Sequence, residues 1–168
     1  MNSLRHYIIE KFQVSKDRIF TDITMEDILE IYGCTEKQGI VTPTSYHADK
    51  RYCKVFKRSS EANNAITNFY NNLPNDDNRF SLWDIIDKNQ IDIVDDKKYE
   101  NITVEKYAHI NGASFKVGIR NKNDRMIFHI SFERDIWIVS DNNDITDKEL
   151  DDYIEICKNI IDYIFSNF

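Results

Sequence analysis

The sequence predicts an α+β fold, and three observations lead to this prediction. Apolar residues follow helical spacing in the first part of the chain, β-rich runs separated by turns fill about residues 91–140, and a long amphipathic stretch follows them. We expect a helical N-terminal half, an antiparallel β-meander, and a C-terminal helix that packs on the sheet. With 168 residues, the chain has the length of a single domain, 1–168, with a candidate subdomain boundary near residues 75–80.

The N-terminal half carries several helix signals. Side chains that accept hydrogen bonds from free backbone N–H groups precede apolar runs, which is typical of helix starts. Residues 34–46 contain a glycine and a proline and are predicted to form a loop. The predicted helices run over about residues 2–12, from a capping box at Thr24 and Asp27 to a C-cap at Gly33, from Ser59 or Ser60 to Pro74, and from Ser81 to about Lys88.

The middle of the chain is predicted to form three to five antiparallel strands. Asn111-Gly112 is the strongest hairpin signal in the chain, because both residues tolerate the positive φ angles of a tight turn. Residues 121–125 are polar, lie between two apolar runs, and predict a second turn.

The C-terminal helix is the clearest element of the sequence. Thr146 and Glu149 form a capping box that marks its start. One helical face is then apolar, which predicts packing against the sheet. This face consists of Leu150, Tyr153, Ile154, Cys157, Ile160, Ile161, Ile164, Phe165 and Phe168.

Composition limits the classes of function. The net charge is −7, and an acidic surface repels nucleic acid phosphates and anionic lipid. The apolar runs are short, and the three cysteines suggest reduced thiols, so we expect a cytoplasmic protein without a membrane segment. Only four glycines are present, and no glycine-rich phosphate-binding motif occurs. We therefore expect no cofactor and no structural metal.

A basic segment stands out against this acidic background. Residues 46–58 contain five cationic side chains and a single carboxylate, Asp49. If the segment is a helix, most of these cations share one face, which suits a phosphate backbone or an acidic partner surface. The alternative is a solvated face that pairs with acidic groups of the same protein. The candidate residues are Lys50, Arg51, Lys54, Lys57 and Arg58.

Four residues are candidates for catalysis. His109 and His129 are each followed two residues later by an amide or a hydroxyl, an arrangement that resembles two-histidine phosphoesterases, although only the second unit has the hydroxyl. Asp95 and Lys116 partly match a magnesium-dependent nuclease, but Ser114 stands where a second carboxylate is expected. Magnesium is implied only by this nuclease interpretation.

Residues 141–168 carry the opposite charge, with eight carboxylates against two lysines. Acids near the start of a helix are stabilised by its dipole, which is the structural explanation. The functional explanation is an acidic face around Asp151, Asp152 and Glu155 that occupies a basic cleft in a protein partner.

These observations favour a small intracellular binding or regulatory protein that acts through charged surface complementarity, such as an inhibitor or immunity-type protein, without catalysis. The alternative is a nucleic-acid-binding protein, or a metal-dependent nuclease or phosphodiesterase, that uses the basic helix and the central sheet. The sequence leaves the partner and the oligomeric state open.

Overall fold

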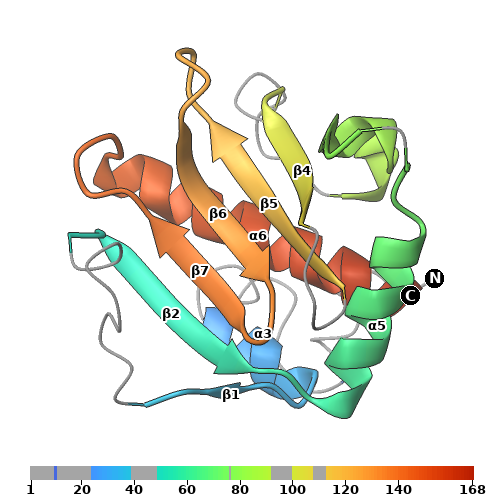
Figure 1. Ribbon diagram of the computed structural model, residues 1–168. Coiled ribbons are helices and arrows are strands. Elements are labelled where there is room, and N and C mark those ends of the chain that lie inside the picture. The colour runs from blue at the N-terminus through green and yellow to red at the C-terminus, as the bar shows by residue number, and fades with distance from the viewer. Residues whose placement is uncertain (1–9, 11–23, 39–48, 76, 92–99, 108–112) are drawn as a thin grey trace.

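The computed structural model describes residues 10, 24–38, 49–75, 77–91, 100–107 and 113–168 (Figure 1). In these residues, seven strands form one antiparallel sheet in the order β1-β2-β7-β6-β5-β4-β3. The strands are β1 (Thr35–Glu36), β2 (Tyr52–Lys57), β3 (Arg79–Ser81), β4 (Ile102–Tyr107), β5 (Ser114–Arg120), β6 (Met126–Phe132) and β7 (Ile136–Ser140). The helices are α3 (Met25–Ile31), α5 (Ser60–Asn71) and α6 (Asp147–Asn167), with 3₁₀ turns η1 (Leu82–Asp84) and η2 (Lys88–Gln90).

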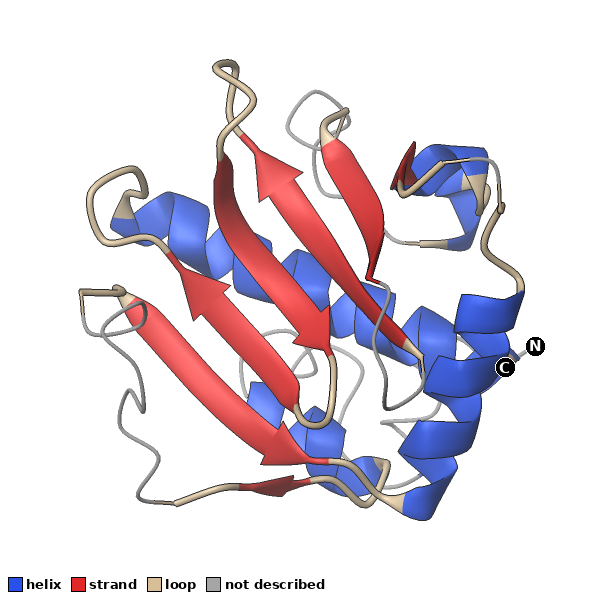
Figure 2. Ribbon diagram, viewed as in Figure 1, coloured by secondary structure: helices blue, strands red, loops and turns tan. Residues whose placement is uncertain are grey.

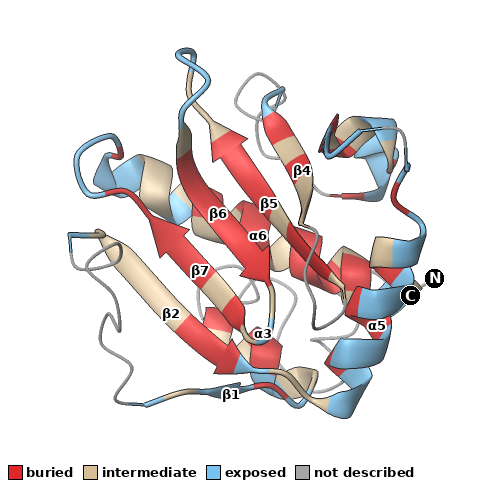
Figure 3. Ribbon diagram, viewed as in Figure 1, coloured by how far each residue is buried: buried red, intermediate tan, exposed pale blue. Residues whose placement is uncertain are grey.

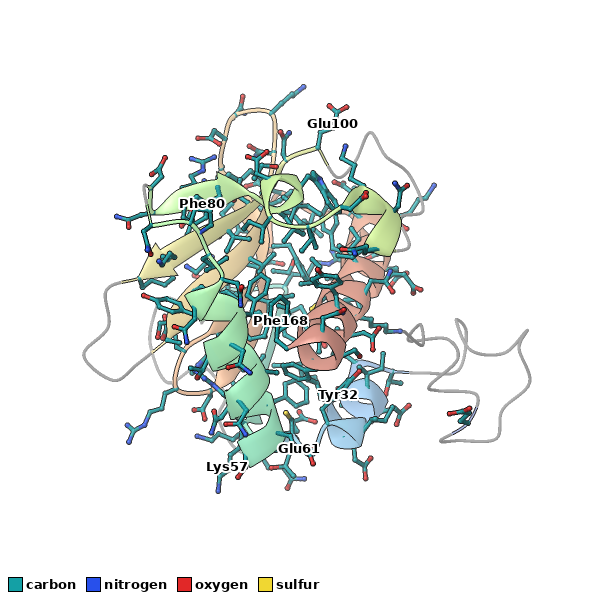
Figure 4. All side chains as sticks on the ribbon, turned by 90° about the vertical axis from the view of Figure 1, so that its right-hand side faces the viewer. Tyr32, Lys57, Glu61, Phe80, Glu100 and Phe168 are labelled. Carbon is teal, nitrogen blue, oxygen red and sulfur yellow. The ribbon has the colours of Figure 1, made fainter. Side chains whose placement is uncertain are left out.

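The α+β class predicted from the sequence is confirmed (Figure 2). A side view shows α3, α5 and α6 on one side of the sheet (Figure 4). Each described helix is too short or too polar to cross a lipid bilayer.

The predicted meander is present as β4, β5, β6 and β7, which are neighbours in chain order. Apolar side chains pair across all four strands: Val104 lies opposite Val117, Val117 opposite Ile130, and Ile130 opposite Ile138. This row belongs to the core beneath the helices. The predicted turn at residues 121–125 joins β5 to β6, and Asp124 adopts a φ of 61° there. Asn111-Gly112 lies outside the described residues.

The prediction of a helical N-terminal half is corrected, because this half supplies β1, β2 and β3 to the sheet. Within the basic segment, Tyr52–Lys57 form strand β2 rather than a helix. It contains Tyr52, Val55 and Phe56, whose side chains pack well on a pleated surface, and it pairs with β7 along five residues. Phe56 is only 1% exposed and enters the core, so burial on the sheet outweighs the helical spacing of the cations.

Two smaller predictions are also corrected. Part of the predicted loop 34–46 is β1, and residues 39–46 of it lie outside the described residues, as do almost all of residues 2–12. The predicted helix from Ser81 is replaced by β3 and the two short 3₁₀ turns. Phe80 of β3 lies opposite Val104 and joins the core, so sheet pairing again decides the local structure.

The capping signals predict the helix starts correctly. Thr24 and Asp27 form the reciprocal capping box of α3, and Gly33 follows the helix with a φ of 74°. The Ser59 hydroxyl accepts a hydrogen bond from the backbone N–H of Ala62 at the start of α5. Thr146 and Glu149 form the capping box of α6.

Helix α6 buries its apolar face against the sheet as predicted, and Figure 3 shows the buried segments of sheet and helix. Cys157, Ile161 and Ile164 are buried, whereas Ile154 is only half-buried. A carboxylate absent from the predicted face, Asp162, is also buried. It accepts a hydrogen bond of 2.5 Å from the Tyr32 hydroxyl, so α6 is joined to the end of α3.

The burial of Ile161 generates a first prediction. Ile161 is 0% exposed, and an Ile161→Asp change would leave an unpaired charge in the core. We expect a loss of several kcal/mol from a total of about 5–15 kcal/mol, and therefore unfolding at ordinary temperature. Urea denaturation followed by circular dichroism measures this loss. Lys148→Asp introduces a carboxylate at an exposed position of the same helix and should leave the midpoint unchanged. An unchanged midpoint for Ile161→Asp would contradict the packing of α6.

Candidate functional site

One face of the sheet carries polar groups rather than helices. Because side chains alternate along a strand, the residues between the core positions point away from α3, α5 and α6. We call this side the outer face, and in the described part of the chain no helix packs on it (Figures 1 and 4). Its central residues are Thr103, Glu105, Tyr107, Ser114, Lys116, Gly118, Arg120, His129, Ser131, Trp137 and Val139.

Lys116 lies in the middle of the outer face. Glu105 of β4 and Ser131 of β6 lie directly opposite it on the two neighbouring strands. The ammonium lies 5.3 Å from the centre of the Tyr107 ring. Burial lowers the pKa of Lys116 below its usual range, although Glu105 and Glu133 oppose this effect. The charge of Lys116 is therefore only partly compensated.

Glu105 does not neutralise Lys116, because its carboxylate is held by Arg120 in a close ion pair. Both side chains of this pair are largely buried, with exposed fractions of 20% and 14%. Arg120 also lies 4.0 Å from Asp124, which in turn binds Arg79. The four groups form a network in which two cations and two carboxylates balance one another.

The structure brings together two of the four catalytic candidates. His129 lies opposite Gly118 on the outer face, diagonal to Lys116, and is only 7% exposed. His109 and Asp95 lie outside the described residues. Among the described residues, no three His, Cys, Asp or Glu side chains are grouped so that they could hold a metal ion. The outer face therefore presents a cation and an imidazole without a described metal cluster.

The predicted cationic face of residues 50–58 does not form, because strand alternation separates its members. Lys54 lies on the side of the helices and Lys57 on the outer side, where its side chain is exposed (Figure 4). Most of these cations contact other elements of the same protein. Lys50 binds Asp141 at 2.5 Å, Arg51 binds Asp147, Lys54 binds Glu26 and Glu36 at 3.0 Å each, and Arg58 donates to Asn63 at 3.4 Å.

These contacts agree with the alternative interpretation, in which the cations pair with acidic groups of the same protein. Hydrogen bonds to Glu26 and Glu36 raise the pKa of Lys54, so its positive charge is stabilised in place. Asp141 is only 8% exposed and binds both Lys50 and Arg125, the latter at 2.9 Å. The sequence shows the acidic residues that follow β7. It does not predict the pairing of β2 with β7, which places Lys50 next to them.

The acidic candidates lie on α6. Asp151 is exposed, whereas Asp152 and Glu155 are half-buried, and Asp152 has further contacts. Asp147, Asp151 and Glu155 follow one another at intervals of four residues along the helix, and we call them the acidic stripe. Asp147 is neutralised by Arg51. Asp151 and Glu155 have no ion-pair partner among the described residues.

The contacts of the basic segment generate a second prediction. A Lys54→Glu change would place three carboxylates together, with Glu26 and Glu36, and should reduce the free energy of unfolding by about 1–2 kcal/mol. Lys57→Glu makes the same charge change at an exposed position of the same strand, and should stay within about 0.5 kcal/mol of the wild type. Urea denaturation of the two variants measures the difference. Equal stabilities would contradict the structural role of Lys54.

Comparison of the chain with protein-family models, with curated proteins and with solved structures gives no match in any of the three. Its function therefore has to be inferred from the surfaces of the molecule itself.

Proposed function

We propose that this protein is a non-catalytic binding or regulatory protein that recognises a basic protein partner through the acidic stripe of α6. An inhibitor or immunity-type protein would act in this way, because a carboxylate surface can occupy the cationic cleft of an enzyme. The observation that carries the proposal is the pair Asp151 and Glu155. Like charges four residues apart on a helix destabilise it by about 0.2–0.5 kcal/mol, and neither carboxylate forms an ion pair with a described cation.

The distribution of charge supports this proposal. Three cations near the start of α6 are engaged: Arg51 with Asp147, Lys50 with Asp141, and Arg125 with Asp141 and Asp144. The acids nearest the sheet are thus compensated within the molecule. Further along α6, Asp151 and Glu155 are available to a cation from another protein. Charges at the rim of an interface mainly raise the association rate, and salt screens them.

A third prediction tests the stripe. The double change Asp151→Lys and Glu155→Lys should leave stability nearly unchanged, because neither residue has a described ion-pair partner. It should remove co-purification of a basic partner, or slow association by at least tenfold at low salt. Biolayer interferometry with the co-purified partner, at two ionic strengths, measures the rate.

The matched control is Asp84→Lys with Asp87→Lys. These two carboxylates are also exposed, but they belong to η1 and to the start of η2 rather than to α6, and η2 meets α6 at Tyr163, eight residues beyond Glu155. The control should bind the partner as the wild type does. If both double variants bind the partner equally well, the acidic-stripe proposal is wrong.

The second candidate is a phosphodiester-handling protein, and it is favoured by a different observation. Lys116 and His129 share the outer face, where a cation and an imidazole could bind and protonate a phosphate ester. The basic segment adds little to this candidate, since most of its cations are engaged within the protein.

A fourth prediction separates the two candidates. Incubation of the wild type with single-stranded and double-stranded nucleic acid, with and without magnesium, should give no cleavage above that of a heat-denatured sample. Cleavage that disappears in His129→Ala, in a variant with an unchanged melting temperature, would instead establish the phosphodiesterase function and displace the binding proposal.

A further inference from the structure

The Lys116 side chain carries a positive charge that few described groups stabilise. Its side chain is half-buried, and among the described residues its ammonium contacts an aromatic ring but forms no hydrogen bond or ion pair. A partly desolvated ammonium without an ion-pair partner is unfavourable, which agrees with the pKa of Lys116 that burial lowers. An anion placed next to it would remove this penalty.

Two neighbouring carboxylates, Glu105 and Glu133, oppose the lowering of the Lys116 pKa, but neither forms an ion pair with its ammonium. Glu105 is the carboxylate opposite Lys116, but Arg120 holds it, and Arg120 and Arg79 share Asp124. Because these two cations and two carboxylates balance one another, the network adds no net charge. Among the described residues, Lys116 therefore lies without an ion pair at the centre of the outer face, with Glu133 as a further carboxylate near it.

Two hydroxyl groups lie beside Lys116 on the same face. Ser131 is directly opposite on β6, roughly 5 Å away between Cβ atoms, and Ser114 precedes Lys116 by two residues on β5. Ser131 and Ser114 are 4% and 5% exposed. Neither hydroxyl has a hydrogen-bond partner in the part of the chain that the structure describes, so each has a hydrogen to donate to a ligand.

Apolar groups border this cluster. Tyr107 lies on the β4 side of the ammonium, and Met126 lies over Gly118, where any added side chain would collide with it. Gly118 is the next outer-face position after Lys116 on β5. The space that a side chain at residue 118 would take is therefore occupied by a thioether, which limits water near Lys116 and strengthens electrostatic attraction there.

From this arrangement we propose that the outer face holds an oxyanion site in which the Lys116 ammonium and the hydroxyls of Ser131 and Ser114 bind one phosphate group. A tetrahedral phosphate offers acceptor oxygens in several directions, which matches a single ammonium flanked by two hydroxyls. A planar carboxylate is better served by the paired donors of a guanidinium, whereas lysine binds phosphate as a point charge. His129 lies diagonal to Lys116, at the edge of the site.

This site is separate from the acidic stripe, because the sheet lies between α6 and the outer face (Figure 4). It also needs no bond cleavage. A phosphate bound there could be a free ion or part of a phosphomonoester, and both present the same group to Lys116.

The test is a titration of the labelled wild type with sodium phosphate, followed by ¹H–¹⁵N NMR, against sodium acetate at the same ionic strength. We expect phosphate to shift the amide signals of Ser114, Lys116 and Ser131 in a saturable way, and acetate to leave them nearly unchanged. Shifts that are absent, that are equal for both anions, or that lie elsewhere in the protein would overturn the site.

Two variants sharpen the test. Lys116→Gln should weaken phosphate binding at least tenfold, whereas Lys122→Gln, at an exposed position in the β5–β6 turn, should leave it unchanged. Ser131→Ala should weaken binding severalfold and serves as the second variant if Lys116→Gln fails to fold. Equal affinity of the wild type and a folded Lys116 or Ser131 variant would refute the proposal.

Parallel titrations with inorganic phosphate and phosphoserine identify the source of the phosphate group. Tighter binding of phosphoserine indicates a monoester ligand, and equal binding indicates free phosphate.

Discussion

Strand β2 pairs with β7, with Tyr52 opposite Ser140 and Phe56 opposite Ile136, and most other features of the molecule depend on this contact. The pairing covers the edge of the meander, which would otherwise expose unpaired backbone groups of β7. It sends Phe56 into the core and supports the two-residue edge strand β1. It also brings Lys50 and Arg51, which precede β2, next to the carboxylates that follow β7.

Pairing of the strands therefore decides which cations and carboxylates of this acidic protein meet. Asp141 is nearly buried between Lys50 and Arg125, and Lys54 joins the Glu26 and Glu36 side chains. These partners come from different elements of the fold, so each pair stabilises the tertiary arrangement rather than a single helix. A buried carboxylate that loses its cations is strongly destabilising, which makes these residues poor candidates for exchange with an external ligand.

The molecule has two sides with different chemistry. On the helix side, α6 presents the acidic stripe to solvent, which suits the cationic surface of a protein partner. On the outer face, Lys116 lies without an ion pair among the described residues, beside two serine hydroxyls, which is the arrangement proposed to bind a phosphate group. Since the sheet separates the two surfaces, a change on one side leaves the other intact. The two proposed binding functions can therefore be tested, and can fail, independently.

The sequence by itself determined the elements whose signals are local. The capping residues Thr24, Ser59 and Thr146 mark the starts of α3, α5 and α6, and the β-rich runs separated by turns predict the meander of β4–β7, because these patterns depend on neighbours within a few residues. Only the tertiary structure decided which conformation and which partners residues 50–58 adopt. The spacing of their cations fits a helix, but a strand partner 80 or more residues away gives their apolar side chains a sheet on which to pack. The register of that long-range pairing also decides which charges meet, and no local pattern encodes it.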